Sequence, residues 1–429
     1  MLNKKLIVTS LLMAGLFVLS SCSLFNDDDL VFKNVYNPVE DLEPEEDPTA
    51  VKAGGVTGKT VASVGNALCF KNISYATDDS IINTYKATGA NHNEYNVNAG
   101  EDYFGSKSLN NFDLYVPNSA KKNDNHVVVL FVHGGAWVSG LKTDVNPYVH
   151  EFANRGYITA TIKYTLLKKE MNDASLSIFR NLDEIDACIK TIKSCLEELE
   201  FDTTKTSLVI GGASSGAHLS MLYSYSRGNQ SALPIKFIID AVGPVDIKPE
   251  GWKRFNSASD EVLDAGITYS AIETQRTNGN LGGLTIADGS STPSVWNDYQ
   301  TMRIANGMCG LPYTLEQVEA TTDENKRDIV NPNEASTSML KVGGGEDLLS
   351  VTYWINSVNK IPMICAYGGR DSVVGIAQYA RLEHALDANS IEHEFFYFKN
   401  SDHTEITKAK DETNYNAFLN KIDQWCQSL

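Results

Sequence analysis

The strongest constraint on this chain is a regular alternation of apolar runs and helical patterns that starts near Gly65 and continues to the C-terminus. The run 126–135 (HVVVLFVHGG) is rich in β-branched residues and shows no polar alternation, which is typical of a strand buried on both faces. In 181–199, apolar residues recur at helical spacing. Strands that alternate with helices form a mostly parallel sheet with helices on both faces, joined by right-handed crossovers. The sequence therefore predicts a twisted α/β domain.

The predicted elements, and the one segment in which strands and helices stop alternating, define the predicted domain boundaries. We predict a single sheet domain over 65–429, interrupted at about 251–347, where the alternation stops. This insertion separates the sixth and seventh predicted strands, so it is either a cap over the active face or an excursion across the surface. Strands are expected at 67–76, 110–117, 126–135, 157–164, 206–212, 235–244, 361–369 and 393–400, and helices at 145–155, 181–199, 214–226, 375–388 and 415–427.

The first residues of the chain have the pattern of an export signal. Lys4 and Lys5 precede the apolar run Leu6–Leu19, which has about the length of a signal-peptide core and is short for a membrane span. The run ends in Leu-Ser-Ser-Cys at Cys22, which resembles the lipobox of bacterial lipoproteins. That resemblance implies that 1–22 is a signal peptide and that lipid on Cys22 anchors the protein to a bacterial membrane in the cell envelope. A plain secretory signal is the alternative, and both interpretations predict an extracytoplasmic protein.

Residues 23–64 have the composition of a flexible acidic tether. Between Ser23 and Ala50 there are nine acidic residues, three prolines and one basic residue. Such a segment buries too little apolar surface to offset the entropy of ordering it. The formal net charge of the whole chain, −18, also argues against a nucleic-acid partner, which would need clustered Lys and Arg.

The six cysteines besides Cys22 predict neither a metal site nor a disulfide framework. They are scattered, and no C-x-x-C pair occurs. Cys188 and Cys195 lie two helical turns apart on a predicted helix, roughly 10 Å along its axis. That separation is too large for a disulfide bond, so we expect both to be buried apolar side chains.

The stretch GGASSGAHL, residues 211–219, follows a predicted strand and opens the next predicted helix. It contains G-x-S-x-G with Ser214 at the centre. On a sharp strand-to-helix turn of this kind the serine backbone is strained and its hydroxyl stands clear. Gly212 and Gly216 lack side chains where strand and helix must pass close together. An ordinary turn also uses glycine and serine, so the pattern needs catalytic partners elsewhere.

Ser215 is in the wrong register to be the nucleophile, because Ala213 and Ala217 would then occupy the two glycine positions. Its backbone N–H lies in the first turn of the predicted helix. There it points toward negative charge that develops at a bound substrate. Ser215 is therefore a predicted oxyanion donor.

A nucleophilic serine needs a base, and the base needs an acid that orients it. Asp371 follows the predicted strand 361–369 and its Gly-Gly turn, so it is the predicted acid. His403 follows the last predicted strand in a polar loop, so it is the predicted base. Asp246, Asp347 and Asp402 are weaker candidates for the acid, and His218, His384 and His393 are interpreted as packing or surface residues.

The segment HGGAW, 133–137, follows a buried predicted strand, where two glycines let backbone N–H groups turn toward a ligand. Together with the motifs above, it resembles the α/β-hydrolase superfamily, especially carboxylesterases of the hormone-sensitive-lipase-like and bacterial feruloyl-esterase-like groups. The resemblance runs from about Asn111 to the C-terminus. FDLYVP is similar to the family's LDLYxP. IKYTL is similar to the segment written NYRL, with Tyr164 matching and Thr165 departing. GASSGAHL is close to GxSAGAHL, with Ser215 in place of alanine.

The resemblance implies an α/β-hydrolase fold and a serine esterase, whose triad order in the chain is Ser214, Asp371, His403. It also implies that the N–H groups of Gly135 and Ala136 join Ser215 in an oxyanion hole, although Ala136 replaces the usual third glycine. The family hydrolyses short-chain carboxylic esters, often acetyl groups on sugars or aryl esters, without a metal or organic cofactor. The residues expected to support the motifs are His133, Gly134, Gly212 and Gly216.

Two other classes of function stay open. A peptidase of the prolyl-oligopeptidase type uses the same fold and triad but usually adds a propeller, and this chain has no repeat array to build one. A binding lipoprotein without catalytic activity could keep the fold, but it would have no reason to keep all three triad members. The expected partner is a small-molecule or carbohydrate-linked ester, and the sequence does not predict an oligomeric state.

Overall fold

The computed structural model describes residues 60–75, 111–167, 177–247, 308–309, 348–371 and 373–429. At its centre lies a nine-stranded sheet in the order β1-β2-β3-β5-β4-β6-β7-β8-β9. The strands are β1 (Thr60–Val64), β2 (Ala67–Ser74), β3 (Asn111–Pro117), β4 (His126–Val132), β5 (Ile158–Lys163), β6 (Thr206–Ala213), β7 (Ile235–Ala241), β8 (Met363–Gly368) and β9 (His393–Phe398). Strands β1, β2, β3 and β5 pair antiparallel, and all strands from β5 across to β9 pair in parallel.

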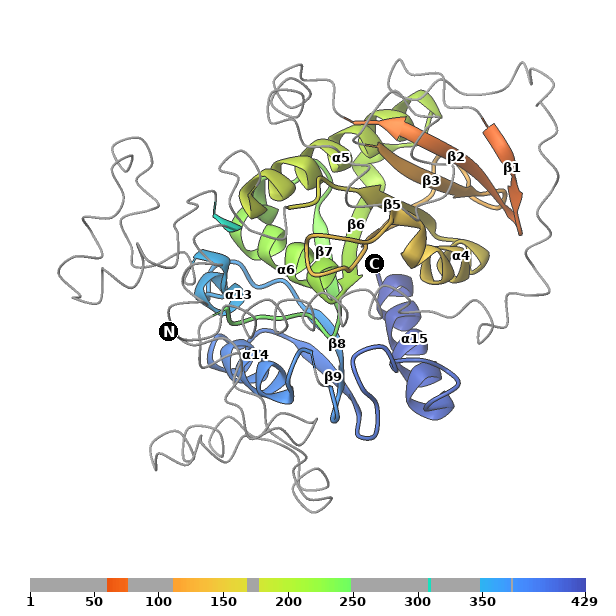
Figure 1. Ribbon diagram of the computed structural model, residues 1–429. Coiled ribbons are helices and arrows are strands. Elements are labelled where there is room, and N and C mark those ends of the chain that lie inside the picture. The colour runs from red at the N-terminus through yellow and green to blue at the C-terminus, as the bar shows by residue number, and fades with distance from the viewer. Residues whose placement is uncertain (1–59, 76–110, 168–176, 248–307, 310–347, 372) are drawn as a thin grey trace, which may run out of the picture.

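Helices cover both faces of this sheet, which confirms the predicted fold class (Figure 1). Helices α4 and α15 pack on one face together with the cluster around Phe131 and Phe152, whereas α5, α6 and α14 pack on the other. The helices are α4 (Asn146–Asn154), α5 (Ile178–Glu198), α6 (Ser215–Arg227), α13 (Val351–Trp354), α14 (Ile376–Ala388) and α15 (Glu412–Gln427), with short 3₁₀ turns η3 (Lys142–Val145), η4 (Thr203–Lys205) and η5 (Gly228–Gln230).

The local sequence explains why the central elements form. All residues of β6 are buried, as expected for a strand with helices on both sides. Helix α5 begins after Ser177, whose side chain accepts a hydrogen bond from the N–H of Arg180, and it buries one apolar stripe. Cys188 and Cys195 lie on that stripe with free thiols and no exposed surface, which confirms the prediction that they are core residues.

Strand β1 corrects the predicted boundary between tether and domain. It lies at the end of the segment 23–64, which we expect to be flexible, and at these five residues the prediction is wrong. Val64 pairs with Ala67, so only Gly65 and Asn66 form the turn, and Gly65 has a φ of +56°. A two-residue turn with positive φ joins antiparallel strands whose twist it matches. The Gly-Asn pair between two short apolar runs was the available signal.

The predicted insertion, 251–347, lies outside the described residues except for 308–309, so its role as a cap stays a prediction. Its flanks are held side by side: the N–H of Ile247 donates to Ser350 Oγ at 3.0 Å, and the N–H of Thr352 donates to the carbonyl of Val245 at 3.4 Å. The described residues on the two sides of this segment, Ile247 and Ser350, are therefore next to each other.

The predicted signal peptide, 1–22 with Cys22, and residues 23–59 of the predicted tether also lie outside the described residues. Lipid attachment and the location in the cell envelope therefore stay predictions. Within the part of the chain that the structure describes, none of the helices combines the length and the apolar character that a bilayer span requires.

Candidate active site

Ser214 occupies the sharp turn between β6 and α6, where the sequence predicts it. Its φ of 55° and ψ of −124° lie in a region that residues with a side chain rarely adopt. Such a conformation costs about 1–3 kcal/mol and persists only where the surrounding structure imposes it. The turn is therefore a strained elbow that presents the serine side chain at the carboxyl end of β6.

Gly212 and Gly216 allow the elbow to press against the end of β4. A β-carbon on Gly216 would lie 2.1 Å from the carbonyl oxygen of Val132, and one on Gly212 would lie 2.5 Å from the same oxygen. Any side chain at either position would push α6 away from β4. Since β4 leads directly into His133, the two glycines bring Ser214 next to the HGGAW loop, as the motif predicts.

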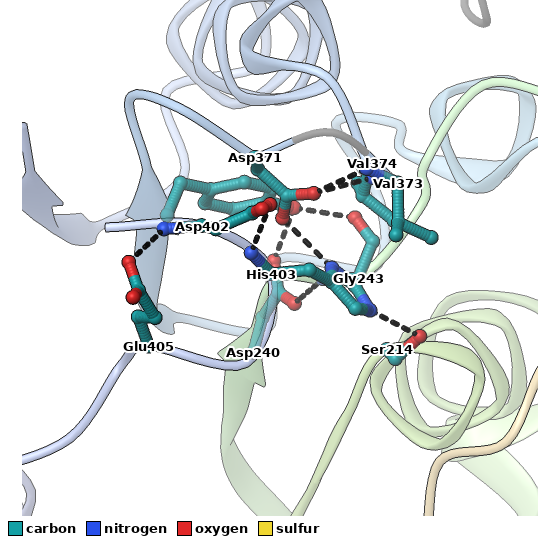
Figure 2. A network of polar contacts seen from close by, with 10 residues as sticks. Ser214, Asp240, Gly243, Asp371, Val373, Val374, Asp402, His403 and Glu405 are labelled. Carbon is teal, nitrogen blue, oxygen red and sulfur yellow. Dashed lines mark hydrogen bonds and ion pairs between the residues drawn. The ribbon is translucent and has the colours of Figure 1, made fainter. Parts of the chain in front are cut away.

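The structure brings Ser214, His403 and Asp371 together in one hydrogen-bonded chain (Figure 2). His403 Nε2 lies 2.9 Å from Ser214 Oγ, and His403 Nδ1 lies 2.8 Å from Asp371 Oδ2. The three residues follow β6, β9 and β8, so each side chain comes from the carboxyl end of a different parallel strand. All three are buried, with at most 8% of each residue exposed.

The partners of Asp371 determine the proton positions in this chain. Its other carboxylate oxygen, Oδ1, accepts hydrogen bonds from the N–H groups of Val373 (2.8 Å) and Val374 (2.7 Å). A carboxylate held in this way accepts at Oδ2 as well, so the imidazole of His403 donates from Nδ1. Nε2 is then the acceptor, and the hydroxyl of Ser214 donates to it. This is the arrangement in which an imidazole can remove the serine proton.

The weaker candidates take other roles. Asp246 pairs with Arg381 at 3.0 Å, and Asp402 accepts a hydrogen bond from the backbone N–H of His403 at 2.7 Å. His384 is exposed and His393 is half-buried, at the start of β9. Asp347 lies outside the described residues.

Hydrogen bonds within the HGGAW loop determine where its backbone N–H groups point. His133 Nδ1 donates to the carbonyl of Gly134 at 2.8 Å, and the carbonyl of Gly135 accepts from both the N–H (3.0 Å) and the hydroxyl (2.8 Å) of Ser139. In a trans peptide the N–H points opposite to the preceding carbonyl. The N–H groups of Gly135 and Ala136 therefore point away from these partners.

The N–H groups of Gly135, Ala136 and Ser215 have no acceptor among the residues that the structure describes. Ser215 is the first residue of α6, where N–H groups have no intrahelical partner and the helix dipole is positive. Ala136 has a φ of 52°, so alanine here adopts a conformation that the missing third glycine would take without strain. These three donors stay predicted oxyanion donors.

The segment after β5 supports this loop. Tyr164 stacks on the ring of His133 with centroids 4.3 Å apart and donates from its hydroxyl to the carbonyl of His133 at 3.1 Å. The N–H of Leu167 donates to the carbonyl of Trp137 at 2.8 Å. Burial lowers the pKa of His133 to about 4, so its ring is neutral at neutral pH. The matching tyrosine of the NYRL-like segment therefore braces the loop.

Thr165 stands where the similar NYRL segment has arginine, and the structure shows the contacts that Thr165 makes. Its N–H and hydroxyl both donate to the buried carboxylate of Glu184, at 2.7 Å and 2.5 Å. Arg180 Nε donates to the same carboxylate at 3.2 Å. The guanidinium that pairs with this carboxylate therefore comes from helix α5.

A second buried carboxyl group, on Asp240 at the end of β7, was not predicted. Its Oδ1 accepts from the N–H of Gly243 at 2.8 Å, and its Oδ2 lies 2.6 Å from the hydroxyl of Tyr367, which is also 2.7 Å from the carbonyl of Gly243. Tyr367 has one proton, and the carbonyl can only accept. All contacts are satisfied when Asp240 keeps its own proton and donates to Tyr367. An acid that directly follows the apolar run Phe237–Ile239 was the available sequence signal.

Asp240 should make the stability of the protein fall as the pH rises. Burial raises its pKa from 3.8 to about 7. The folded state favours the protonated acid. The contribution of Asp240 to the free energy of unfolding is therefore complete below about pH 4 and is lost between about pH 4 and pH 7. The loss is on the order of 4 kcal/mol.

Asp240→Asn should remove this pH dependence. The amide can donate to the hydroxyl of Tyr367 and accept from Gly243 without titrating. We expect the free energy of unfolding of the variant, from urea denaturation, to exceed that of the wild type at pH 8 and to differ less at pH 5. Equal slopes of stability against pH in the two proteins would contradict this assignment.

Comparison with known proteins gives one family match and several distant likenesses of fold. Residues 112–277 match the BD-FAE family, and no curated protein matches the chain. A truncated carbohydrate esterase from gut microbiota is similar at 13% identity and a TM-score of 0.49, covering 86% of this chain and 100% of its own. A bacterial heroin esterase is similar at 16% identity and a TM-score of 0.47, covering 83% and 94%. Esterase B from Lactobacillus Rhamnosis is similar at 14% identity and a TM-score of 0.44, covering 82% and 95%. At such identities and TM-scores, these likenesses do not identify a substrate for this chain.

Proposed function

We propose that this chain, whose residues 112–277 match the BD-FAE family, is a serine hydrolase of the α/β-hydrolase fold that hydrolyses short-chain carboxylic esters, including those on carbohydrate or aryl groups, through an acyl-enzyme on Ser214. The observation that carries the proposal is the hydrogen-bonded chain from Ser214 through His403 to Asp371. The resemblance of the motifs to those of carboxylesterases supports the choice of an ester bond.

The first half of the reaction follows from the proton positions. His403 takes the proton of Ser214 at Nε2 while the serine oxygen attacks the ester carbonyl carbon. Asp371 holds Nδ1–H and stabilises the imidazolium that forms. The carbonyl oxygen becomes negative and accepts hydrogen bonds from the N–H groups of Gly135, Ala136 and Ser215. Each such donor is worth about 3–4 kcal/mol of transition-state stabilisation.

The second half reuses the same groups. The imidazolium of His403 gives its proton to the oxygen of the leaving alcohol, and the acyl group stays on Ser214. Water then enters, loses a proton to Nε2, and attacks the acyl carbon through the same oxyanion site. Collapse of this intermediate releases the carboxylic acid and returns the proton to Ser214.

Paired substrates separate the proposed esterase from the alternatives. The purified protein should hydrolyse p-nitrophenyl acetate, and it should turn over the matching p-nitroanilide far more slowly. A preference for the anilide would instead favour the peptidase, and a protein inert toward both would favour a binding lipoprotein. Acetylated sugars, feruloyl esters and a series of p-nitrophenyl acyl chains would then define the acyl and alcohol groups.

Acid should inactivate the enzyme reversibly. Protonation of His403 at Nε2 removes the acceptor for the Ser214 proton, so kcat/KM should fall as the pH is lowered. The measurement is kcat/KM for p-nitrophenyl acetate between pH 5 and pH 8, corrected for spontaneous hydrolysis. A flat profile over this range would count against His403 as the base.

A further inference from the structure

His218 joins three segments of the active-site end that are far apart in the sequence. It lies one turn beyond Ser214 on α6, and its backbone N–H donates to the carbonyl of Ser214 at 3.0 Å. Its ring has no exposed surface. The indole N–H of Trp137 donates to Nδ1 at 3.2 Å, and Nε2 lies 2.8 Å from the carbonyl of Leu349. One imidazole thus connects the elbow helix, the oxyanion loop and the segment that leads into α13.

The two partners of the His218 ring permit only one proton arrangement. An indole N–H can only donate, and a carbonyl can only accept. Nδ1 is therefore unprotonated, Nε2 carries the proton, and the ring is neutral. Burial also lowers the pKa of His218 to about 4, so the same form is kept at neutral pH. If the ring were charged, Nδ1 would also carry a proton, and its N–H would face the indole N–H of Trp137 with no acceptor between them.

The loop that His218 contacts is strained. Ala136 and Trp137 have φ angles of 52° and 63°, which residues with side chains adopt only when their surroundings hold them. The Trp137 ring meets His218 edge-on, with centroids 5.2 Å apart and planes at 86°. Because Trp137 directly follows Ala136, a rotation of Trp137 would redirect the peptide groups that carry the predicted oxyanion donors.

We propose that His218 is a positioning residue, which through Trp137 fixes the direction of the Gly135 and Ala136 N–H groups relative to Ser214. The inference rests on the proposed esterase function. This positioning role differs from a purely structural one because the two hydrogen bonds of the ring have different partners. The bond with Trp137 reaches the oxyanion loop, whereas the bond with Leu349 does not. A displacement of about 1 Å at such a site can cost about 10²-fold in rate.

Two substitutions separate the two hydrogen bonds. In His218→Asn the side-chain oxygen takes the place of Nδ1 and still accepts from Trp137, while the donor to Leu349 is lost. In His218→Gln the side-chain nitrogen takes the place of Nε2 and still donates to Leu349, while the acceptor for Trp137 is lost. Trp137→Phe removes the same hydrogen bond from the other side and keeps an aromatic ring.

The expected result is a division between the variants in the kinetics of p-nitrophenyl acetate hydrolysis. In His218→Gln and Trp137→Phe, kcat should fall about 10- to 100-fold with little change in KM, because ground-state binding does not use the oxyanion donors. His218→Asn should restore most of that kcat. The double variant His218→Gln/Trp137→Phe should be no slower than either single one, since both remove one interaction. Melting temperatures measured by circular dichroism show whether each variant is folded.

Equal losses of kcat in His218→Asn and His218→Gln, or full kcat in Trp137→Phe, would overturn the proposal and leave His218 a structural residue. If His218→Gln does not fold, the kcat of Trp137→Phe still tests the proposal. The rate at which a fluorophosphonate labels Ser214 separates this failure from that of the proposed function. A wild type that is neither labelled nor active ends both proposals, whereas an active wild type with unchanged variants ends only this one.

Discussion

Replacing Ser214 by alanine is expected to lower kcat for ester hydrolysis by about 10⁴- to 10⁶-fold, with the fold intact. The hydroxyl is the group that would form the acyl-enzyme, and nothing else within reach of His403 Nε2 in the described structure can replace it. Alanine also has a β-carbon, so the strain of the elbow at φ 55° is unchanged. The measurement is kcat for p-nitrophenyl acetate together with the melting temperature.

A fluorophosphonate probe provides the control for that experiment. It should label the wild-type protein at Ser214, as identified by peptide mass spectrometry, and should leave the alanine variant unlabelled. Ser215, the adjacent hydroxyl, should not be labelled in either protein, because it does not contact His403. Retention of ester turnover in a folded Ser214→Ala protein would refute the proposed mechanism.

The next largest effect is expected for Asp371→Asn, at about 10⁴-fold in kcat. The side-chain oxygen of asparagine can still accept from Val373 and Val374, so the loop after β8 should keep its shape. Its NH₂ group then faces His403 Nδ1 and can only donate to it. The imidazole would hold its proton on Nε2, where it can no longer accept the proton of Ser214.

Asp402→Asn is the matched control for the role of Asp371. Asp402 is also a carboxylate beside His403, but it accepts from the backbone N–H of His403, whereas Asp371 is the partner of Nδ1. Removing its charge leaves the bond to Nδ1 in place, so kcat should change far less than in Asp371→Asn. Comparable losses in the two variants would mean that net charge near the imidazole matters, and the geometric role of Asp371 would be wrong.

Much of the fold could be predicted because its signals are local. Residues that are adjacent in the sequence are enough to predict a strand from the apolar run in 126–135 and a helix from the apolar stripe in 181–199. Both elements form where expected. Ser214 could be placed on its turn because Gly212 and Gly216 must lie close to β4. Asp371 and His403 follow the last two strands in chain order. The family's order of triad residues then linked three distant positions that no local pattern connects.

What the sequence did not reveal depends on pairs of residues that meet only in the folded chain. His218 could be expected in the core, but its bond to Leu349 joins residues 131 positions apart. The proton on Asp240 depends on Tyr367, 127 positions away. Buried polar groups must find a partner, but periodicity does not say which one. The short strand β1 was missed for another reason. It adjoins a long acidic segment, and the composition of that segment predicts a flexible tether more strongly than the five residues of β1 predict a strand.

The positions of Ser214 and His403 along the chain have a consequence for biosynthesis. They are 189 residues apart, and His403 follows β9, an edge strand and the last strand of the sheet in chain order. While the ribosome is still making the protein, the nucleophile is present but its base is not. On the proposed mechanism, a nascent chain therefore gains its reactivity only after His403 has been made, and truncated products that end before β9 should not hydrolyse esters.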